Sequence, residues 1–82
     1  MEKSPFTREH RVLVGLLRTR REEAGLTQEE LARRLKVSQS SLSKWERGDR
    51  RIDLVQLRSW CQATGCSLAE FINQFEKRLA RR

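Results

Sequence analysis

The stretch TQEELARRLKVSQSSLSKWERG, residues 27–48, carries the clearest structural pattern in the sequence. Its apolar residues recur at helical spacing in two runs, with a short break at Lys36 and Val37. Ala32 places a small residue between the apolar positions, as two helices need when they cross closely through a turn of three or four residues. The pattern therefore predicts two short helices packed at a steep angle. The side chains expected to hold them together are Leu31, Leu35, Val37, Leu42 and Trp45.

The second helix of this pair has an outward face made of short polar side chains. Four serines and a glutamine lie between residues 38 and 43. Serine is a mediocre helix former, and an exposed face made for solubility alone would be rich in Glu and Lys. The composition therefore indicates that this face has a function other than solubility. Its outward residues are Gln39, Ser40, Ser43, Lys44 and Arg47.

Capping patterns predict where the helices begin. An N-cap Ser, Thr or Asp followed three residues later by Glu or Gln satisfies two backbone N–H groups reciprocally. This pattern occurs three times, as Thr27 with Glu30, Asp53 with Gln56, and Ser67 with Glu70. Together with the glycines that end helices, it predicts five helices and no strand in one domain over residues 1–82. The predicted segments are 8–24, 27–35, 38–48, 53–65 and 67–80.

Apolar spacing predicts the buried residues of the other helices. The first helix would begin at Ser4-Pro5 or at Thr7, and Leu13, Leu16 and Leu17 fall on one of its faces. The fourth would turn Leu54, Leu57 and Cys61 toward the core, with Trp60 as a further candidate. The fifth carries a broad apolar stripe. That stripe consists of Leu68, Phe71, Ile72, Phe75 and Leu79.

Composition limits the function classes. The net charge of +7 over 82 residues implies an acidic partner, either nucleic acid or a membrane surface. No apolar run approaches the ~20 residues that span a bilayer, and the charges are spread around every helix, which disfavours a membrane partner. The first ten residues, MEKSPFTREH, lack the apolar stretch of a secretory signal. We therefore expect a cytoplasmic protein.

The residues that could carry metal or enzyme chemistry are few. Cys61, Cys66 and the single His10 cannot supply the four ligands of a structural zinc site, so we expect no metal and no cofactor. We interpret the cysteines as small buried residues and His10 as a solvated residue in the first helix. No nucleophile–base pair, paired carboxylates or glycine-rich phosphate loop is present, so the sequence does not indicate an enzyme.

A set of residues in the first three helices carries a resemblance to a known family. The set comprises Arg21, residues 25–28 (GLTQ), Leu31, Ala32, Val37, Ser38 and residues 42–48 (LSKWERG). It resembles the XRE family, the helix-turn-helix proteins that include phage repressors and Cro. The resemblance implies an all-α, compact five-helix repressor-like DNA-binding domain, whose helix-turn-helix spans residues 27–48. One departure is Lys36, because the family often has Gly at this left-handed position, where another residue costs ~1 kcal/mol.

The resemblance implies that the third helix enters the major groove of double-stranded DNA. Short side chains then allow its backbone to approach the bases. Gln39, Ser40 and Lys44 become candidate base readers, with Gln39 suited to adenine and Lys44 to guanine or a phosphate. The candidate phosphate contacts are Gln28, Ser38, Ser43, Arg47, Arg50 and Arg51. Solvated loop charge is the alternative for Arg50 and Arg51, and solvent is the expected environment of Arg33 and Arg34.

Arg21 and Glu46 have a different expected role. Glu46 is an acid in the most basic part of the chain, beside a helix that would face DNA. In the family the equivalent residues resemble a partly buried ion pair. We therefore expect a structural ion pair between Arg21 and Glu46 that joins the first helix to the end of the third.

The expected function is that of a sequence-specific transcriptional regulator, of repressor type, acting as a homodimer on a palindromic operator. Two recognition helices ~34 Å apart would read the two half-sites. The apolar stripe of the fifth helix is either the dimer surface or a surface packed on the first helix. The alternative function is a protein-interaction module with the same fold, such as an antitoxin or controller that binds a protein partner. The cations around the third helix argue against this alternative.

Overall fold

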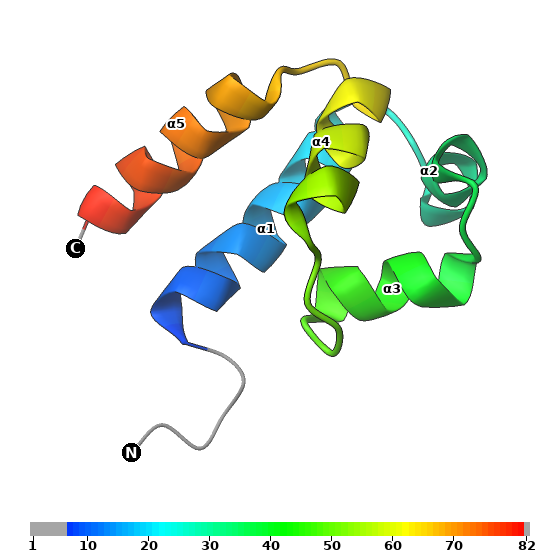
Figure 1. Ribbon diagram of the computed structural model, residues 1–82, viewed down its shortest axis with the longest axis horizontal. Coiled ribbons are helices and arrows are strands. Elements are labelled where there is room, and N and C mark those ends of the chain that lie inside the picture. Colours follow the sequence, from blue (N-terminus) through cyan, green and yellow to red (C-terminus); the bar gives the residue numbers. More distant parts are fainter. Residues whose placement is uncertain (1–6, 82) are drawn as a thin grey trace.

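Five α-helices make up the computed structural model, which describes residues 7–81, and those residues contain no strand (Figure 1). The all-α prediction is thereby confirmed. The helices are α1 (Arg8–Glu23), α2 (Gln28–Leu35), α3 (Gln39–Arg47), α4 (Leu54–Ala63) and α5 (Leu68–Ala80). None of the described helices is long and apolar enough to cross a membrane.

All three predicted capping boxes are present, at the starts of α2, α4 and α5. The backbone N–H of Thr27 donates to the Glu30 carboxylate at 2.9 Å, and that of Ser67 donates to Glu70 at 2.8 Å. These bonds lower the pKa of both carboxyl groups below the ordinary glutamate value. Thr7 caps α1 by accepting from the backbone of His10, while the alternative start at Ser4-Pro5 lies outside the described residues.

The core collects side chains from all five helices. Its fully buried side chains include Leu16, Leu17, Leu31, Leu42, Trp60, Cys61 and Phe71. Trp45 of α3 and Trp60 of α4 meet edge to face, with ring centroids 6.3 Å apart. The indole N–H of Trp60 donates to the carbonyl of Leu17 at 3.1 Å, which satisfies the buried donor. The core thus joins α1, α3 and α4 through two large aromatic side chains.

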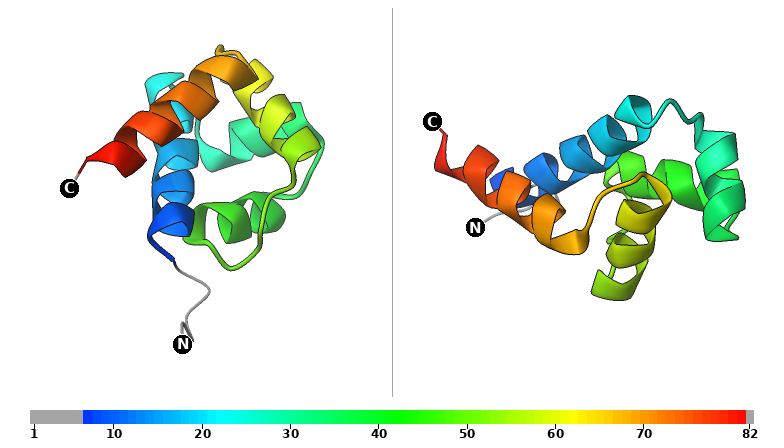
Figure 2. Two further views of the ribbon diagram at one scale, coloured as in Figure 1. Left: turned by 60° about the vertical axis from the view of Figure 1, so that its left-hand side comes forward. Right: turned by 90° about the horizontal axis from the view of Figure 1, so that it is seen from above.

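The apolar stripe of α5 packs against α1, and the two views of Figure 2 show the helices side by side. Phe71 is fully buried in this contact, whereas Ile72 stays 39% exposed. The Arg8 guanidinium at the start of α1 donates to the Leu79 carbonyl at 2.7 Å. Of the two alternatives for the stripe, packing on the first helix is therefore the one observed in this chain.

Two sequence interpretations are wrong. Leu54 was expected in the core, but it is 63% exposed, because the first turn of α4 extends beyond the other helices (Figure 2, right). His10 was expected in solvent, but it is buried, with Nε2 3.3 Å from the carbonyl oxygen of Gly48 at the end of α3.

The two cysteines are free thiols. Cys61 is buried as expected, whereas Cys66, just before α5, is only half-buried. Burial, reinforced by the neighbouring Cys66, raises the pKa of the Cys61 thiol to about 12. Cys61 is therefore protonated at neutral pH and packs as a small apolar residue.

Candidate nucleic-acid interface

The turn between α2 and α3 fixes the angle between the two helices. Lys36 adopts the left-handed conformation, with φ 60° and ψ 41°, at the position where the family often has Gly. The N–H of Val37 donates to the Ala32 carbonyl at 3.0 Å, and the N–H of Lys36 donates to the Arg33 carbonyl. This pair of bonds is a Schellman motif. It ends α2 sharply, and α3 begins after three intervening residues.

One side of α3 is buried and the other is exposed. Leu42 and Trp45 face the core, and Ser38 caps the helix by accepting from the N–H of Ser41 at 3.0 Å. The opposite side carries short or flexible polar residues. Gln39, Ser40, Lys44 and Arg47 are exposed, and Ser43 is half-buried among them.

Guanidinium groups line one edge of α3. Arg47 donates from Nη1 to the Ser43 hydroxyl and from Nε to the Asp49 carboxylate, both at 3.0 Å. Arg50 lies over the Trp45 ring at 5.9 Å and donates to the Ser41 hydroxyl at 3.3 Å. These contacts hold both cations beside the helix. Arg51 follows them in the exposed loop before α4.

A buried ion pair ties α1 to the end of α3. Arg21 Nε donates to Glu46 Oε2 at 2.6 Å, and Nη2 donates to Oε1 at 3.1 Å. The two side chains are only 11% and 4% exposed. The hydrogen bond to Glu46 raises the pKa of Arg21 above its ordinary value, against the opposing effect of burial. Arg21 also donates to the Leu26 carbonyl at 2.8 Å, which extends the network into the turn before α2.

Gln28 belongs to the same network. Its side-chain amide donates to Glu46 Oε1 at 3.0 Å. Gln28 was expected to bind a phosphate, and one of its side-chain N–H groups already donates within the protein. Its second amide proton and its backbone N–H at the start of α2 are the groups that remain for an anion. Sequence reasoning missed this bond because Gln28 and Glu46 lie 18 residues apart.

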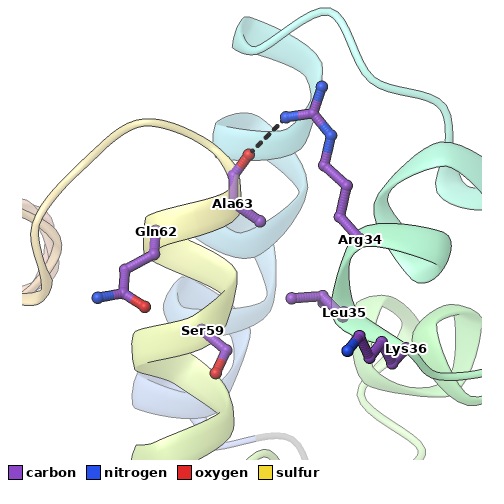
Figure 3. A pocket seen from close by; sticks show the side chains of 6 residues that line it. All are labelled: Arg34, Leu35, Lys36, Ser59, Gln62 and Ala63. Atoms are coloured by element: carbon purple, nitrogen blue, oxygen red, sulfur yellow. Dashed lines mark hydrogen bonds between the residues drawn. The ribbon is translucent and has the colours of Figure 1, made fainter.

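Arg34 connects α2 to the C-terminal end of α4. Its guanidinium donates to the Ala63 carbonyl at 3.1 Å (Figure 3). The bond spans one end of an open depression of about 390 Å³ between the two helices. The depression is lined by Arg34, Leu35, Lys36, Ser59, Gln62 and Ala63. Arg33 is exposed beside Glu29, with 3.9 Å between their charged groups, as expected of a solvated residue.

Comparison with known proteins supports the geometry. A helix-turn-helix family model matches residues 17–71. A solved XRE-family like protein from Pseudomonas syringae pv. tomato str. DC3000 is 34% identical, with 85% of each chain covered and a TM-score of 0.79. The clp gene regulator ClgR from Corynebacterium glutamicum is 33% identical, with 88% of this chain and 77% of that chain covered and a TM-score of 0.78.

A third solved structure shares the fold at lower identity. The restriction-modification controller protein C.Esp1396I is 21% identical, with 93% of this chain and all of that chain covered and a TM-score of 0.83. A comparison with curated proteins finds no match. The family model covers more than half of the chain, and two of the solved structures are over 30% identical. The chain therefore belongs to the XRE family of helix-turn-helix DNA-binding transcription regulators.

Proposed function

We propose that the chain binds a specific double-stranded DNA sequence in the cytoplasm. Residues 1–82 form the single domain that does so. It acts as a repressor-type homodimer on a palindromic operator. The observation that carries the proposal is the outward face of α3, where short polar side chains are exposed between flanking cations. Such a face fits a major groove, because short side chains let the helix approach base edges while the cations meet phosphates. A repressor of this kind acts by occupying a promoter.

The candidate DNA contacts divide into two groups by their place in the structure. Gln39 and Ser40 lie in the first turn of α3 and Lys44 lies one turn later, so these three would read base edges. Ser38, Ser43, Arg47, Arg50, Arg51 and Gln28 would contact phosphates. Ser43 accepts from Arg47 and keeps its own O–H proton for a phosphate oxygen. The buried Arg21–Glu46 pair would fix the angle at which α3 enters the groove.

The test is selection of bound sites from a random duplex library with the purified protein. We expect enrichment of one palindromic sequence whose half-site centres lie about one helical turn, ~34 Å, apart. Absence of any enriched sequence would overturn the proposal. Binding to duplex DNA without salt dependence between ~50 and 200 mM would instead favour the protein-interaction module.

Three alanine variants separate base reading from phosphate contact on the selected site. Gln39→Ala should relax specificity at one base position, at a cost of about 1–3 kcal/mol. Lys44→Ala should also relax specificity at one base position if Lys44 reads a base. If Lys44 contacts a phosphate, the variant should instead reduce the slope of log binding constant against log salt concentration by about 1 per binding site. Arg33→Ala is the matched control, because Arg33 is an exposed cation on α2 beside Glu29. A loss for Arg33→Ala as large as that for Lys44→Ala would show that net charge alone drives binding.

A further inference from the structure

The C-terminal end of α2 carries three cations and borders two depressions of the surface. The depression between α2 and α4, of about 390 Å³, has Arg34 and Lys36 in its lining (Figure 3). A second depression of about 340 Å³ is lined by Leu26, Glu30, Arg33 and Arg34. Arg34 lines both depressions, so the two meet at its side chain. We call these two depressions, with Arg33, Arg34 and Lys36, the α2 basic groove.

The cations of the groove have few partners within the protein. No described residue forms a salt bridge with Arg34 or Lys36, and the charged groups of Arg33 and Glu29 are 3.9 Å apart. Arg34 donates to the Ala63 carbonyl at 3.1 Å. That bond uses one of the five N–H donors of the guanidinium and holds the group at the groove. The groove therefore presents positioned positive charge that the chain does not neutralise.

The rest of the lining combines one carboxylate with apolar surface. The carboxylate belongs to Glu30, and it already accepts from the backbone N–H of Thr27 at 2.9 Å. Three cations and this single acid leave the groove with a net charge of +2. Leu26 lines one depression and Leu35 the other, and both are half-buried. Each depression thus offers an apolar contact beside a positive charge.

Lys36 places its ammonium group at this groove at a cost in backbone strain. Its φ of 60° lies in the left-handed region, which Gly adopts without strain. Strained residues of this kind concentrate at functional sites. Gly at this position would relieve the strain but would remove one cation from the groove. The presence of Lys therefore favours a function for its charge.

An acidic peptide fits the α2 basic groove better than duplex DNA does. No residue that lines the two depressions is among the candidate DNA contacts. Duplex DNA offers phosphates on the outside of a stiff rod and brings no apolar side chain to fill a hollow. An extended peptide can set carboxylates against the guanidinium groups and an apolar side chain against each leucine. Both features of the groove are then used.

We propose that the α2 basic groove binds an extended acidic segment of a partner protein. Carboxylates of that segment pair with Arg34 and Lys36, and its apolar side chains contact Leu26 and Leu35. This inference goes beyond the proposed function, because it gives the chain a second binding surface that does not use the outward face of α3. A copy that is bound to DNA through α3 then holds the partner protein at the same time.

The first test is selection from a displayed library of random twelve-residue peptides on the 82-residue chain. Excess random duplex DNA is included, so that it occupies the cations around α3. We expect enrichment of peptides that carry several Asp or Glu residues and at least one large apolar residue. A selection that enriches no acidic sequence overturns the proposal.

Nuclear magnetic resonance of the ¹⁵N-labelled chain then locates one enriched peptide, made synthetically. The largest changes in backbone amide shifts should fall in residues 30–37 and 59–63, whereas duplex DNA should perturb residues 39–51. A peptide that mainly perturbs residues 39–51, or that duplex DNA displaces, occupies the DNA-facing surface and overturns the proposal. Peptide binding at the groove by a chain that selects no DNA sequence would instead contradict the proposed function alone.

Substitutions in the groove separate peptide binding from folding. Lys36→Gly should weaken the peptide roughly 3-fold, as for loss of one exposed ion pair, although it relieves backbone strain. Arg34→Ala should weaken it roughly 10-fold, because a guanidinium can pair with a carboxylate through two N–H groups. Fluorescence anisotropy of the labelled peptide measures both changes, and neither variant should lose affinity for duplex DNA.

Lys77→Ala is the matched control for the loss of one positive charge. Lys77 is exposed on α5 and lines neither depression. Its replacement should leave the affinity for the peptide unchanged. If Lys77→Ala weakened the peptide as much as Lys36→Gly did, net charge alone would explain the binding and the proposal would be overturned.

Discussion

The carboxylate of Glu46 is a single point at which three helices meet. It accepts from Arg21 of α1 and from Gln28 of α2, while Glu46 itself belongs to α3. Because it is only 4% exposed, its charge depends on these donors rather than on water. The orientation of the recognition helix is therefore coupled to the integrity of one ion pair.

At this ion pair, removing one partner should cost more than removing both. Arg21→Met or Glu46→Leu alone should each lower the free energy of unfolding by about 3–5 kcal/mol, because each leaves a buried charge without its partner. The double variant should recover much of that loss. Urea denaturation of the four proteins measures the coupling free energy directly.

The exposed pair of Arg18 and Glu22 provides the control cycle. Its charged groups are 3.3 Å apart, but its side chains are 65% and 56% exposed. Its coupling should be no more than about 0.5 kcal/mol, as for other surface pairs four residues apart on a helix. Zero coupling between Arg21 and Glu46 would refute our account of the network.

Residues whose surroundings are local could be predicted from the sequence, and those with distant partners could not. The exposed side of α3 follows from helical spacing alone, once Leu42 and Trp45 are taken as buried. His10 is buried by the end of α3, 38 residues away, and a lone histidine in a polar stretch gives no signal of that contact. The base-reading and phosphate roles stay predictions, because they depend on a DNA surface that lies outside this chain.

The turn between α2 and α3 stores backbone strain at one residue. Lys36 holds φ at 60°, a conformation that costs a residue with a Cβ about 1 kcal/mol relative to Gly. Lys36→Gly should therefore stabilise the protein by up to about 1 kcal/mol. The greater conformational freedom of Gly in the unfolded chain offsets part of this gain. Thermal or urea unfolding measures the gain.

Lys36→Ala separates backbone strain from charge at this turn. It removes the same positive charge but keeps a Cβ, so it should give no comparable stabilisation. Equal gains for Ala and Gly would mean that relief of charge repulsion, and not backbone strain, explains the effect.

Helix boundaries were easier to predict than helix environments. The capping boxes involve residues three apart, so Thr27, Asp53 and Ser67 mark three helix starts without any knowledge of tertiary structure. Leu54 shares a helix face with Leu57, yet only Leu57 is buried. Periodicity shows which side of α4 faces inward, but not that the core ends before its first turn.

Acid should lower the global stability of the protein, because it protonates the capping carboxylates. The pKa values of Glu30 and Glu70 are lowered in the folded state by backbone hydrogen bonds from Thr27 and Ser67. Their contribution is therefore complete above the ordinary glutamate pKa of about 4.3 and is lost as the pH falls through the lowered values. The variant with Glu30→Gln and Glu70→Gln should show a shallower fall in unfolding free energy from about pH 5 to 3. Urea denaturation across this range measures both slopes.

Glutamine keeps an acceptor oxygen at each cap, so the double variant should still fold at neutral pH. Replacing Glu76 with Gln gives a control on an exposed acid of α5 that has no capping role. If the wild-type protein and the double variant lost stability in parallel below pH 5, titration of these caps would not be the cause.

The edge-to-face contact of Trp45 and Trp60 also has an optical consequence. The sequence contains two tryptophans and no tyrosine, so these two rings dominate the near-ultraviolet absorption and the intrinsic fluorescence of the protein. One ring lies on the recognition helix beneath Arg50, and the other lies in the core against α1. Light emitted by this pair therefore originates at the junction between α3 and the helices that support it. A shift of α3 relative to α4 would change the Trp45–Trp60 contact, and the intrinsic fluorescence of the protein would report it.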